Sequence, residues 1–495
     1  MSYSFVIQKD HFEILKELGQ KEAPNEVGAF LLAQKIDSRL STRLVARELV
    51  LFEPDELEQS SFLCAPTPKA LSRFLTKFKR SGLHRNEYVV VYVHTHPFAK
   101  GTTRFSSIDH SSMSSDRTTV YDPHFGDMKS AWLVFNSHFN SFDGRLIERG
   151  GHITHNIDQI IIIGKHLERL YRNPLKKSKE LNDEKKFSRM SIIPGIDLDK
   201  YRNWNIGLVG LGGNGASCLE SIVMMGVGDG GNLVLVDHDS IEVSNLSRIP
   251  YTSDVHLGMP KVQVAKKYLR EIQPGRKCTA LKNRVWDAEA QEYLKGVDLL
   301  FINSDNDLCR YYASYFSSLY SIPLMDAGAG VISHQGELSS IGGQVRVQIP
   351  GVTPCLMCNM GLDLSRVEAA LPWKKDELSV EVRRELANEG YFSEELQGPS
   401  PSVFYLNQMC ASLTSVMTSQ LLQNGIVHPG VTFELRPPYM MTAINVESEE
   451  GCPICHDSTL AYENPKLLTL EKLFNRETLS HPFPVGPNAE KELKQ

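Results

Sequence analysis

Two histidines stand two residues apart in the segment YVHTHPFAKGTTRFSSID, at the end of an apolar run. On an extended segment, residues i and i+2 point to the same side, so the imidazoles of His94 and His96 can reach one metal ion. Asp109 offers a third ligand, and three protein ligands with one open position are typical of catalytic zinc. Glu26 can take a proton from an attacking water, and Ser106 can hydrogen-bond an oxyanion. The pattern predicts metal-dependent hydrolysis.

Each part of this pattern also has a simpler interpretation. Most isolated His-x-His pairs are surface histidines, and Ser106-x-x-Asp109 is a common helix cap. Together, a Glu before an apolar strand, HTHP and SxxD resemble the JAMM (JAB/MPN) metalloproteases over about residues 1–150. The loop between His96 and Ser106 is longer than that family usually has. A non-catalytic binding module that recruits a carrier protein therefore stays open as an alternative.

The resemblance implies an α/β fold of the cytidine-deaminase-like kind and an (iso)peptidase that cuts after the C-terminal glycine of a ubiquitin-like protein. It further implies that one catalytic Zn²⁺ is bound by His94, His96 and Asp109. Glu26 would be the acid/base and Ser106 would stabilise the oxyanion.

A glycine-rich turn, GLGGNG, follows the apolar run IGLV and opens a helical segment. Gly210, Gly212 and Gly215 allow a tight turn and close approach of a phosphate to the helix N-terminus. The motif alone is weak evidence, and an NAD-dependent dehydrogenase is its default alternative. Asp237 ends the next apolar run, where a carboxylate can hold a ribose, and dehydrogenases share this feature.

The segments that follow are more distinctive. DHDSIEVSNLSR (237–248), GMPKVQVA (258–265) and NSDNDLCR (303–310) resemble the ThiF/MoeB/ubiquitin-activating superfamily, as does SRMSIIPGI near residue 190. The resemblance covers about 187–460 and implies a Rossmann-like fold that adenylates a carboxylate with ATP and Mg²⁺. It implies that Asp237 binds ribose, that Asp305 organises Mg²⁺ as the catalytic group, and that Arg189 reaches into the neighbouring subunit of a homodimer. The full implied set for ATP and Mg²⁺ is Arg189, Gly210, Gly212, Gly215, Asp237, Asp239, Asn245, Arg248, Lys261, Asp305 and Asn306.

Four of the nine cysteines form two C-x-x-C pairs, Cys355/Cys358 and Cys452/Cys455. Four thiolates in two such pairs suit a closed, tetrahedral structural Zn²⁺ site, and a redox pair is the alternative. Residues 359–409 contain no cysteine, and Cys410 lies in an apolar helical pattern, which predicts a core position. A thioester step is therefore unsupported, and MoeB-type adenylation without one is the closer parallel.

The patterning predicts an α/β protein. We expect a helix near Asp10–Lys21, and strands at 27–33, 88–93 and 131–135, because short apolar runs between polar turns are typical of strands. A helical pattern is also predicted from about Asn156 to Arg172. From about 187 the pattern becomes strand–helix–strand, as in parallel sheets. The predicted organisation is a JAMM-like domain at 1–165, a charged linker at 166–186, an adenylation domain with a Cys₄ zinc knuckle at 187–465 and a loose tail at 466–495.

Composition excludes several classes of protein. The chain has 495 residues, 41% hydrophobic and 23% charged, with a net charge of −6. The acidic balance disfavours a nucleic-acid binder, and no apolar run is long enough for a transmembrane helix. The N-terminus lacks a secretion signal, so we expect a cytoplasmic protein.

Both halves would act on one chemical end, the C-terminal glycine of a ubiquitin-like or sulfur-carrier protein. One fate of the activated carboxylate is a ubiquitin-like conjugation pathway of bacterial type, which would require a conjugating enzyme. The other is sulfur-carrier chemistry, in which the adenylate becomes a thiocarboxylate.

Overall fold

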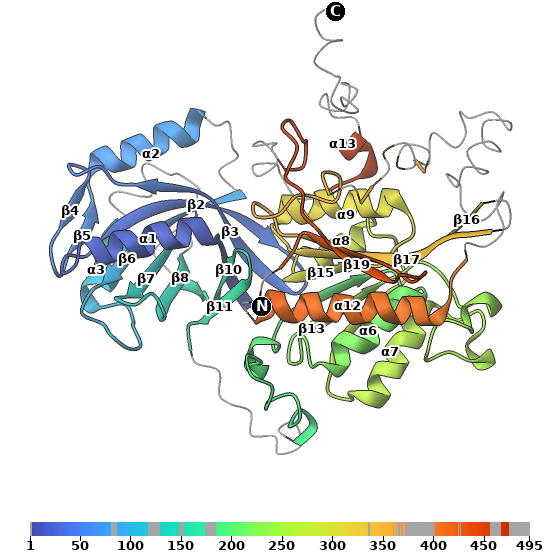
Figure 1. Ribbon diagram of the computed structural model, residues 1–495. Coiled ribbons are helices and arrows are strands. Elements are labelled where there is room, and N and C mark those ends of the chain that lie inside the picture. Colours follow the sequence, from blue (N-terminus) through green and yellow to red (C-terminus); the bar gives the residue numbers. More distant parts are fainter. Residues whose placement is uncertain are drawn as a thin grey trace, which may run out of the picture.

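The structure is a computed structural model in which two sheets lie side by side (Figure 1). It describes residues 2–80, 87–116, 129–147, 153–173, 185–334, 337–359, 361, 362, 364, 367, 370, 371, 401–423, 425, 427–455 and 467–474. Within these ranges, no helix is both long and apolar enough to cross a bilayer.

The N-terminal half is built on a nine-stranded mixed sheet (Figure 1). In sheet order its strands are β11 (Leu167–Tyr171), β10 (Gln159–Ile163), β1 (Ser2–Gln8), β3 (Ser41–Leu51), β2 (Gly28–Asp37), β6 (Tyr88–His96), β7 (Lys129–Asn136), β8 (Phe142–Ile147) and β9 (Ile153–Asn156). Helix α1 (Lys9–Lys21) packs on one face and α2 (Pro68–Arg80) on the other. Because both faces are covered, β6 is a continuous buried apolar run, as the sequence predicted. A small hairpin, β4 (Leu57–Gln59) and β5 (Cys64–Pro66), and helix α3 (Ser107–Asp116) complete this half.

The C-terminal half has an eight-stranded sheet of Rossmann-like, mixed α/β type. In sheet order its strands are β14 (Lys277–Leu281), β13 (Asn232–Val236), β12 (Ile206–Val209), β15 (Leu299–Ile302), β16 (Leu324–His334), β17 (Glu337–Gln348), β18 (Gly430–Glu434) and β19 (Met440–Ile444). The first five are parallel and the last three pair antiparallel. The helices are α6 (Gly213–Met224), α7 (Lys261–Ile272), α8 (Ala288–Leu294), α9 (Asp307–Tyr320), α12 (Phe404–Leu422) and α13 (Leu470–Phe474), with short 3₁₀ turns at Leu198–Lys200, Val243–Asn245 and Asp254–His256.

The helix predicted over Asn156–Arg172 is wrong, because this segment forms the strands β10 and β11. Four consecutive isoleucines, 160–163, fit either a buried helix or a buried strand by hydrophobicity alone. Their β-branched side chains favour the strand, and β10 pairs with both β1 and β11. The N-terminal half therefore continues past residue 165, and the predicted linker at 166–186 begins inside its sheet. Residues 174–184 of that linker, like 475–495 of the predicted tail, lie outside the described residues.

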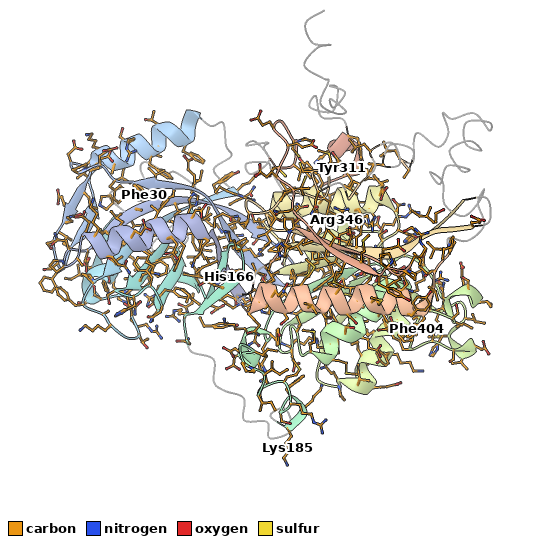
Figure 2. All side chains as sticks on the ribbon, in the orientation of Figure 1. Phe30, His166, Lys185, Tyr311, Arg346 and Phe404 are labelled. Atoms are coloured by element: carbon orange, nitrogen blue, oxygen red, sulfur yellow. The ribbon has the colours of Figure 1, made fainter. Side chains whose placement is uncertain are left out.

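The two halves share one hydrophobic core across their junction. Val6, Ile36, Val45 and Ile161 of the N-terminal sheet belong to the same buried cluster as the strands of the C-terminal half. His166, in the turn between β10 and β11, lies where the halves meet (Figure 2). The halves are therefore packed as parts of one body rather than only tethered.

Two arginines of β3 reinforce this junction by capping α9. Arg43, which is 1% exposed, donates to the carbonyl oxygens of Tyr320 (3.0 Å) and Ser321 (3.1 Å). Arg47 donates to the carbonyl oxygen of Leu319 at 2.6 Å. The last carbonyls of a helix have no partners within the helix and carry partial negative charge, so guanidinium groups stabilise them.

We expect the substitution Arg43→Ala to lower the free energy of unfolding by about 3 kcal/mol, because it leaves buried carbonyl groups without partners. Urea denaturation followed by fluorescence measures this change. The guanidinium of the exposed Arg39, on the same hairpin, lies 5.5 Å from the centre of the Tyr293 ring. Arg39→Ala is the matched control, with an expected loss below about 1 kcal/mol. Equal losses for both variants would contradict a special role for the buried guanidinium.

Candidate functional sites

The first candidate site lies where β6 ends beside the start of β2. Gly28 pairs with His94 in the antiparallel ladder, and this register brings Glu26 next to the histidines. His94 Nε2 lies 3.0 Å from Asp109 Oδ1, and His96 Nε2 lies 3.2 Å from Asp109 Oδ2. Glu26 Oε1 lies 3.9 Å from His96 Nε2. The predicted metal ligands and the predicted base are therefore brought together.

Burial and charge give this cluster unusual proton affinities. Burial, assisted by the nearby charge of Asp109 and opposed by His96, raises the pKa of Glu26 to about 7. Burial also lowers the pKa of His94, which favours the neutral imidazole that binds metals. Although burial alone would raise it, the two histidine rings that face the carboxylate hold the pKa of Asp109 well below its usual range. A carboxyl group with a pKa near 7 is suited to proton transfer at neutral pH.

Ser106 and Asp109 form the helix cap that is the simpler interpretation of their spacing. Ser106 N donates to Asp109 Oδ2 at 2.6 Å, and Asp109 N donates to Ser106 Oγ at 3.1 Å, which is a reciprocal cap at the start of α3. The cap fixes the Asp109 carboxylate, whose oxygens also face the histidines. Because Ser106 Oγ accepts a hydrogen bond here, its own hydroxyl proton remains available to donate.

These residues fit a divalent metal of the zinc class. One ligand atom from each of His94, His96 and Asp109 lies within 4.8 Å of the others. Neither ring nitrogen of the buried His94 has a hydrogen-bond partner of good geometry among the described residues. A buried imidazole normally has a partner, so an unpartnered nitrogen facing a carboxylate suits a metal ligand.

The second candidate site is the glycine-rich turn between β12 and α6. Gly210 has φ +84°, and a Cβ there would lie 2.8 Å from the carbonyl oxygen of Asn303. A Cβ on Gly215 would lie 1.9 Å from the carbonyl oxygen of Gly210, so both positions require glycine. Gly212 is the N-cap of α6 and has open space where a side chain would stand. The turn presents backbone N–H groups at a helix N-terminus, which suits a phosphate.

Charged groups from three loops surround this turn. Asp237 accepts hydrogen bonds from Leu211 N (2.6 Å) and Asp239 N (2.8 Å), and its burial raises its pKa against the opposing charge of Lys261. Lys261 Nζ, at the first residue of α7, lies 2.8 Å from Asp239 Oδ2. A lysine held there is placed to neutralise phosphate charge.

The remaining predicted nucleotide residues flank the same turn. The side chain of Arg248 passes 3.1 Å from the position of a Cβ on Gly213, and its guanidinium donates to Ser244 O at 2.7 Å. The buried Asn245 side chain accepts from Glu242 N at 3.2 Å. The remaining two, Asp305 and Asn306, are exposed at the N-terminus of α9, where Asn306 Oδ1 caps the helix. The structure thus places all of these except Arg189 around one end of the parallel sheet.

Arg189 lies elsewhere in the chain. It is exposed, two residues after Phe187, whose ring packs against Gly226 beyond the C-terminal end of α6. The glycine-rich turn is at the other end of this 12-residue helix, about 18 Å away by helical rise.

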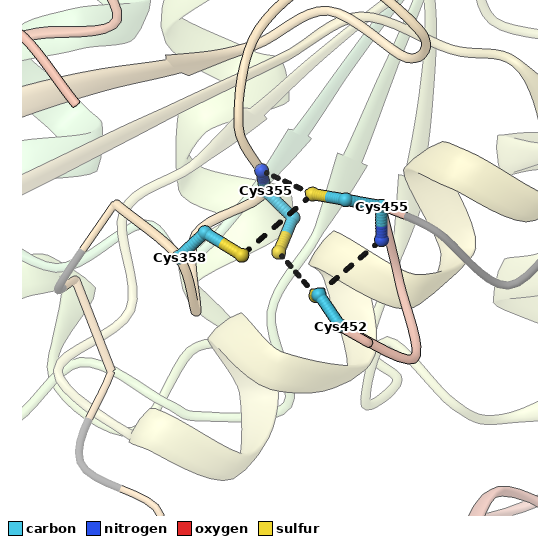
Figure 3. Close-up of side chains that lie close together, drawn as sticks. All are labelled: Cys355, Cys358, Cys452 and Cys455. Atoms are coloured by element: carbon cyan, nitrogen blue, oxygen red, sulfur yellow. Dashed lines mark hydrogen bonds between the residues drawn. The ribbon is translucent and has the colours of Figure 1, made fainter. Parts of the chain in front are cut away.

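The four cysteines of the two C-x-x-C pairs converge in space (Figure 3). Cys355 Sγ lies 3.6 Å from Cys452 Sγ, and Cys455 Sγ lies 3.8 Å from Cys358 Sγ. A tetrahedral ion with zinc–sulfur bonds of about 2.3 Å requires sulfur–sulfur edges of about 3.8 Å. Backbone N–H groups of Cys355 and Glu449 donate to two of the sulfurs, as is favourable for thiolates. The geometry fits a closed Zn²⁺ site and is too wide for disulfides.

The other cysteines offer no activated thiol. Cys410 is buried beside Leu406 and Phe433, as predicted, and burial raises its pKa to about 12. Burial raises the pKa of further thiols in the same way, to about 12 for Cys64, Cys218 and Cys309 and about 11 for Cys278.

A buried charge cluster beside the second site was missed by the sequence analysis. Arg310 Nε lies 3.0 Å from Asp326 Oδ1, and Arg346 contributes a second positive charge. Asn214 of the glycine-rich turn donates to Ala327 O, the neighbour of Asp326, at 2.7 Å. An aspartate inside the apolar run IPLMDAGAG was the available signal, because a buried charge requires a partner.

Comparisons with known proteins identify the C-terminal half. The model of the ThiF family matches residues 186–429. The chain is 30% identical over 165 residues to the molybdopterin-synthase adenylyltransferase of Escherichia coli (strain K12), covering 32% of this chain and 64% of that protein. It is 32% identical over 178 residues to the adenylyltransferase and sulfurtransferase uba4 of Aspergillus clavatus, covering 35% of each chain.

Among solved structures, the chain is similar to E. coli MccB with MccA-N7isoASN, at 17% identity and a TM-score of 0.41 over 52% of this chain and 69% of that one. The chain spans about a third of the length of the A. clavatus relative and somewhat less than two thirds of the length of the E. coli relative. Residues 186–429 thus match the ThiF family, and the chain is similar to adenylyltransferases of this kind.

Proposed function

We propose that this protein activates the C-terminal carboxylate of a small carrier protein by adenylylation, and that its N-terminal half is a zinc-dependent peptidase acting on the same kind of chain end. The observation that carries the first part is the glycine-rich turn surrounded by Asp237, Lys261 and Arg248 in a domain of ThiF type. In the reaction, the glycine carboxylate attacks the α-phosphorus of ATP, the bond to the β-phosphate oxygen breaks, and pyrophosphate leaves with Mg²⁺.

The chain's own residues would position charge rather than form covalent bonds. Lys261 and Arg248 would bind phosphate oxygens, while Asp305, exposed at the N-terminus of α9, would hold Mg²⁺ beside the reacting carboxylate. Preorganised charge of this kind is the main source of catalysis in phosphoryl and adenylyl transfer. The position of Arg189 at the far end of α6 supports a homodimer in which it serves the partner's site.

Sulfur-carrier activation is the favoured fate of the adenylate. Two of the relatives are named for molybdopterin synthase and for sulfur transfer. Among the described residues, the cysteines outside the four-sulfur cluster are buried or half-buried, and burial raises the pKa of each of these thiols. The second candidate is conjugation of the carrier by a separate conjugating enzyme. In that case the carrier adenylate would itself donate the acyl group.

In the N-terminal half, the cluster of His94, His96 and Asp109 supports the peptidase. A zinc ion bound there would supply Lewis acidity to the scissile carbonyl and to the attacking water. Glu26 would accept the proton of the water and deliver it to the leaving amine. Ser106 would donate a hydrogen bond to the developing oxyanion.

The fixed junction keeps the two centres apart. Strand β2 runs ten residues from the metal site to the hairpin that enters the C-terminal half, which is about 30 Å at 3.3 Å per residue. Helix α9 leads a further 14 residues, about 21 Å, from the junction to Asp307 beside the nucleotide turn. One bound chain end therefore contacts one centre at a time.

The test uses candidate carrier proteins ending in glycine, with and without a C-terminal extension. We expect ATP–pyrophosphate exchange only with the exposed glycine end, and metal-dependent removal of the extension from the other form. Exchange without any cleavage would leave the N-terminal half as a recruitment module. No exchange with any glycine-ended carrier would overturn the adenylation proposal.

A further inference from the structure

Strand β11 has two faces that belong to different halves of the protein. As an edge strand it alternates its side chains, so odd and even residues point in opposite directions. Leu167 and Arg169 face the C-terminal half, where Leu167 joins the shared core. Glu168 and Leu170 face the N-terminal half, where Glu168 pairs with Lys9 at 2.7 Å.

On the first face, Arg169 anchors the strand to the adenylation domain. Its guanidinium stacks 3.5 Å from the centre of the Trp204 ring and donates to Asn203 O at 2.9 Å. It also lies 3.5 Å from the buried carboxylate of Asp298, which in turn accepts from Asn205 N at the entrance to β12. A desolvated guanidinium with these contacts is a strong docking point.

On the second face, Arg172 reaches the loop that carries the metal site. Its Nε lies 2.5 Å from Oδ1 of Asp143, a carboxylate that is fully buried. The other oxygen of Asp143 accepts from Phe105 N at 3.3 Å, directly before Ser106. Arg104 closes the arrangement by donating to the carbonyl oxygen of Arg172 at 3.1 Å.

We propose that Arg172, acting through Asp143, is a positioning residue for the segment that carries Ser106 and Asp109, and that Arg169 makes this positioning depend on docking of the adenylation half. The loop after His96 is also held by hydrogen bonds to Asn136, Ser137 and Ser141, and the contact between Asp143 and Phe105 N fixes its last residue before Ser106. Outer groups that orient metal ligands typically change metal affinity 10- to 100-fold. This inference rests on the proposed metal site, and Asp143 and Arg172 contact none of its ligands directly.

The test is a Co²⁺ titration of full-length protein whose open N-terminal site has been stripped with a chelator. Visible Co²⁺ bands report occupancy and ligand geometry at that site. We expect Arg172→Ala to weaken Co²⁺ binding at least ~10-fold, Arg172→Lys to recover part of it, and Arg169→Ala to weaken it in the same direction. Glu168→Gln, on the same strand as Arg169, removes the more exposed ion pair with Lys9 and is the control with unchanged binding.

A second measurement does not require metal. Hydrogen exchange of segment 103–110 in metal-free protein should accelerate in Arg172→Ala and stay unchanged in Glu168→Gln, because the Phe105 amide loses its fixed acceptor. Unchanged affinity and exchange in Arg172→Ala, or equal effects in the control, would overturn the positioning role. Absence of Co²⁺ bands in the wild type would overturn the metal site itself, while hydrogen exchange would still decide the role of Arg172.

Discussion

Substituting Asp109 by Asn should remove the metal ion from the N-terminal site and reduce peptide cleavage at least ~100-fold. The side chain supplies the anionic ligand that both histidines face at 3.0 and 3.2 Å, and a neutral amide is a much weaker ligand. An asparagine oxygen can still accept from Ser106 N, so the cap of α3 and the fold should survive. Metal content per chain and the rate of cleavage of an extended carrier measure the effect.

The variant Glu26→Gln separates loss of metal binding from loss of proton transfer, and it is therefore compared with Asp109→Asn. Glu26 lies 3.9 Å from His96, and we expect it to act as a proton acceptor rather than as a metal ligand. The Glu26→Gln substitution should therefore abolish cleavage, while the metal ion stays bound. ATP–pyrophosphate exchange should be normal in both variants, because the second site lies in the other half. If Asp109→Asn kept both its metal and full cleavage, the peptidase assignment would be wrong.

Replacing Lys261 by Met should lower ATP–pyrophosphate exchange at least ~100-fold, since one lost charged donor to a reacting phosphate typically costs that much. The lysine is 9% exposed at the start of α7, and its ammonium lies 2.8 Å from Asp239 beside the glycine-rich turn. Methionine preserves the length of the side chain and the helix, so the change isolates the charge. Initial rates at saturating carrier protein give the measurement.

Lys267→Met serves as the control on the same helix, because Lys267 is exposed and lies outside the site. It should exchange at the wild-type rate. Wild-type exchange in Lys261→Met would show that this lysine does not contact a phosphate. In both variants the metal content should be that of the wild type, because neither lysine belongs to the cysteine cluster or to the cluster of His94, His96 and Asp109.

Local patterns predicted those features that depend on neighbouring residues. The alternation of a strand put His94 and His96 on one side, and the helix expected near Asp10–Lys21 matches α1 within one residue at its start. Gly210 and Gly215 were identified from spacing, and the structure shows why no side chain fits at either place. Strand alternation, helix periodicity and the left-handed φ of Gly210 are set within a few bonds of backbone, whereas the space beside Gly210 is closed by Asn303, which is distant in the sequence.

The segment 156–172 shows where such patterns fail. Its isoleucine run is compatible with two secondary structures, and the choice between them came from pairing with β1, more than 150 residues earlier in the chain. Strand β10 is buried on both faces, because Ile160 and Ile162 pack into the N-terminal core, whereas Ile161 and Ile163 pack into the core shared with the C-terminal half. The hydrophobicity of this segment therefore predicted correctly that it is buried. It could not predict which parts of the protein cover it.

The sequence by itself determined the chemical inventory: two histidines at strand spacing, a phosphate turn and four cysteines in two pairs. The tertiary structure alone decided which groups meet. It closed a separation of 97 residues between Cys355 and Cys452 to 3.6 Å, placed Glu26 beside His96 through the β2–β6 ladder, and joined Arg172 to Asp143. The physical reason is that side-chain type and spacing are local properties, whereas proximity, burial and the resulting shifts in pKa arise only when distant strands pack together.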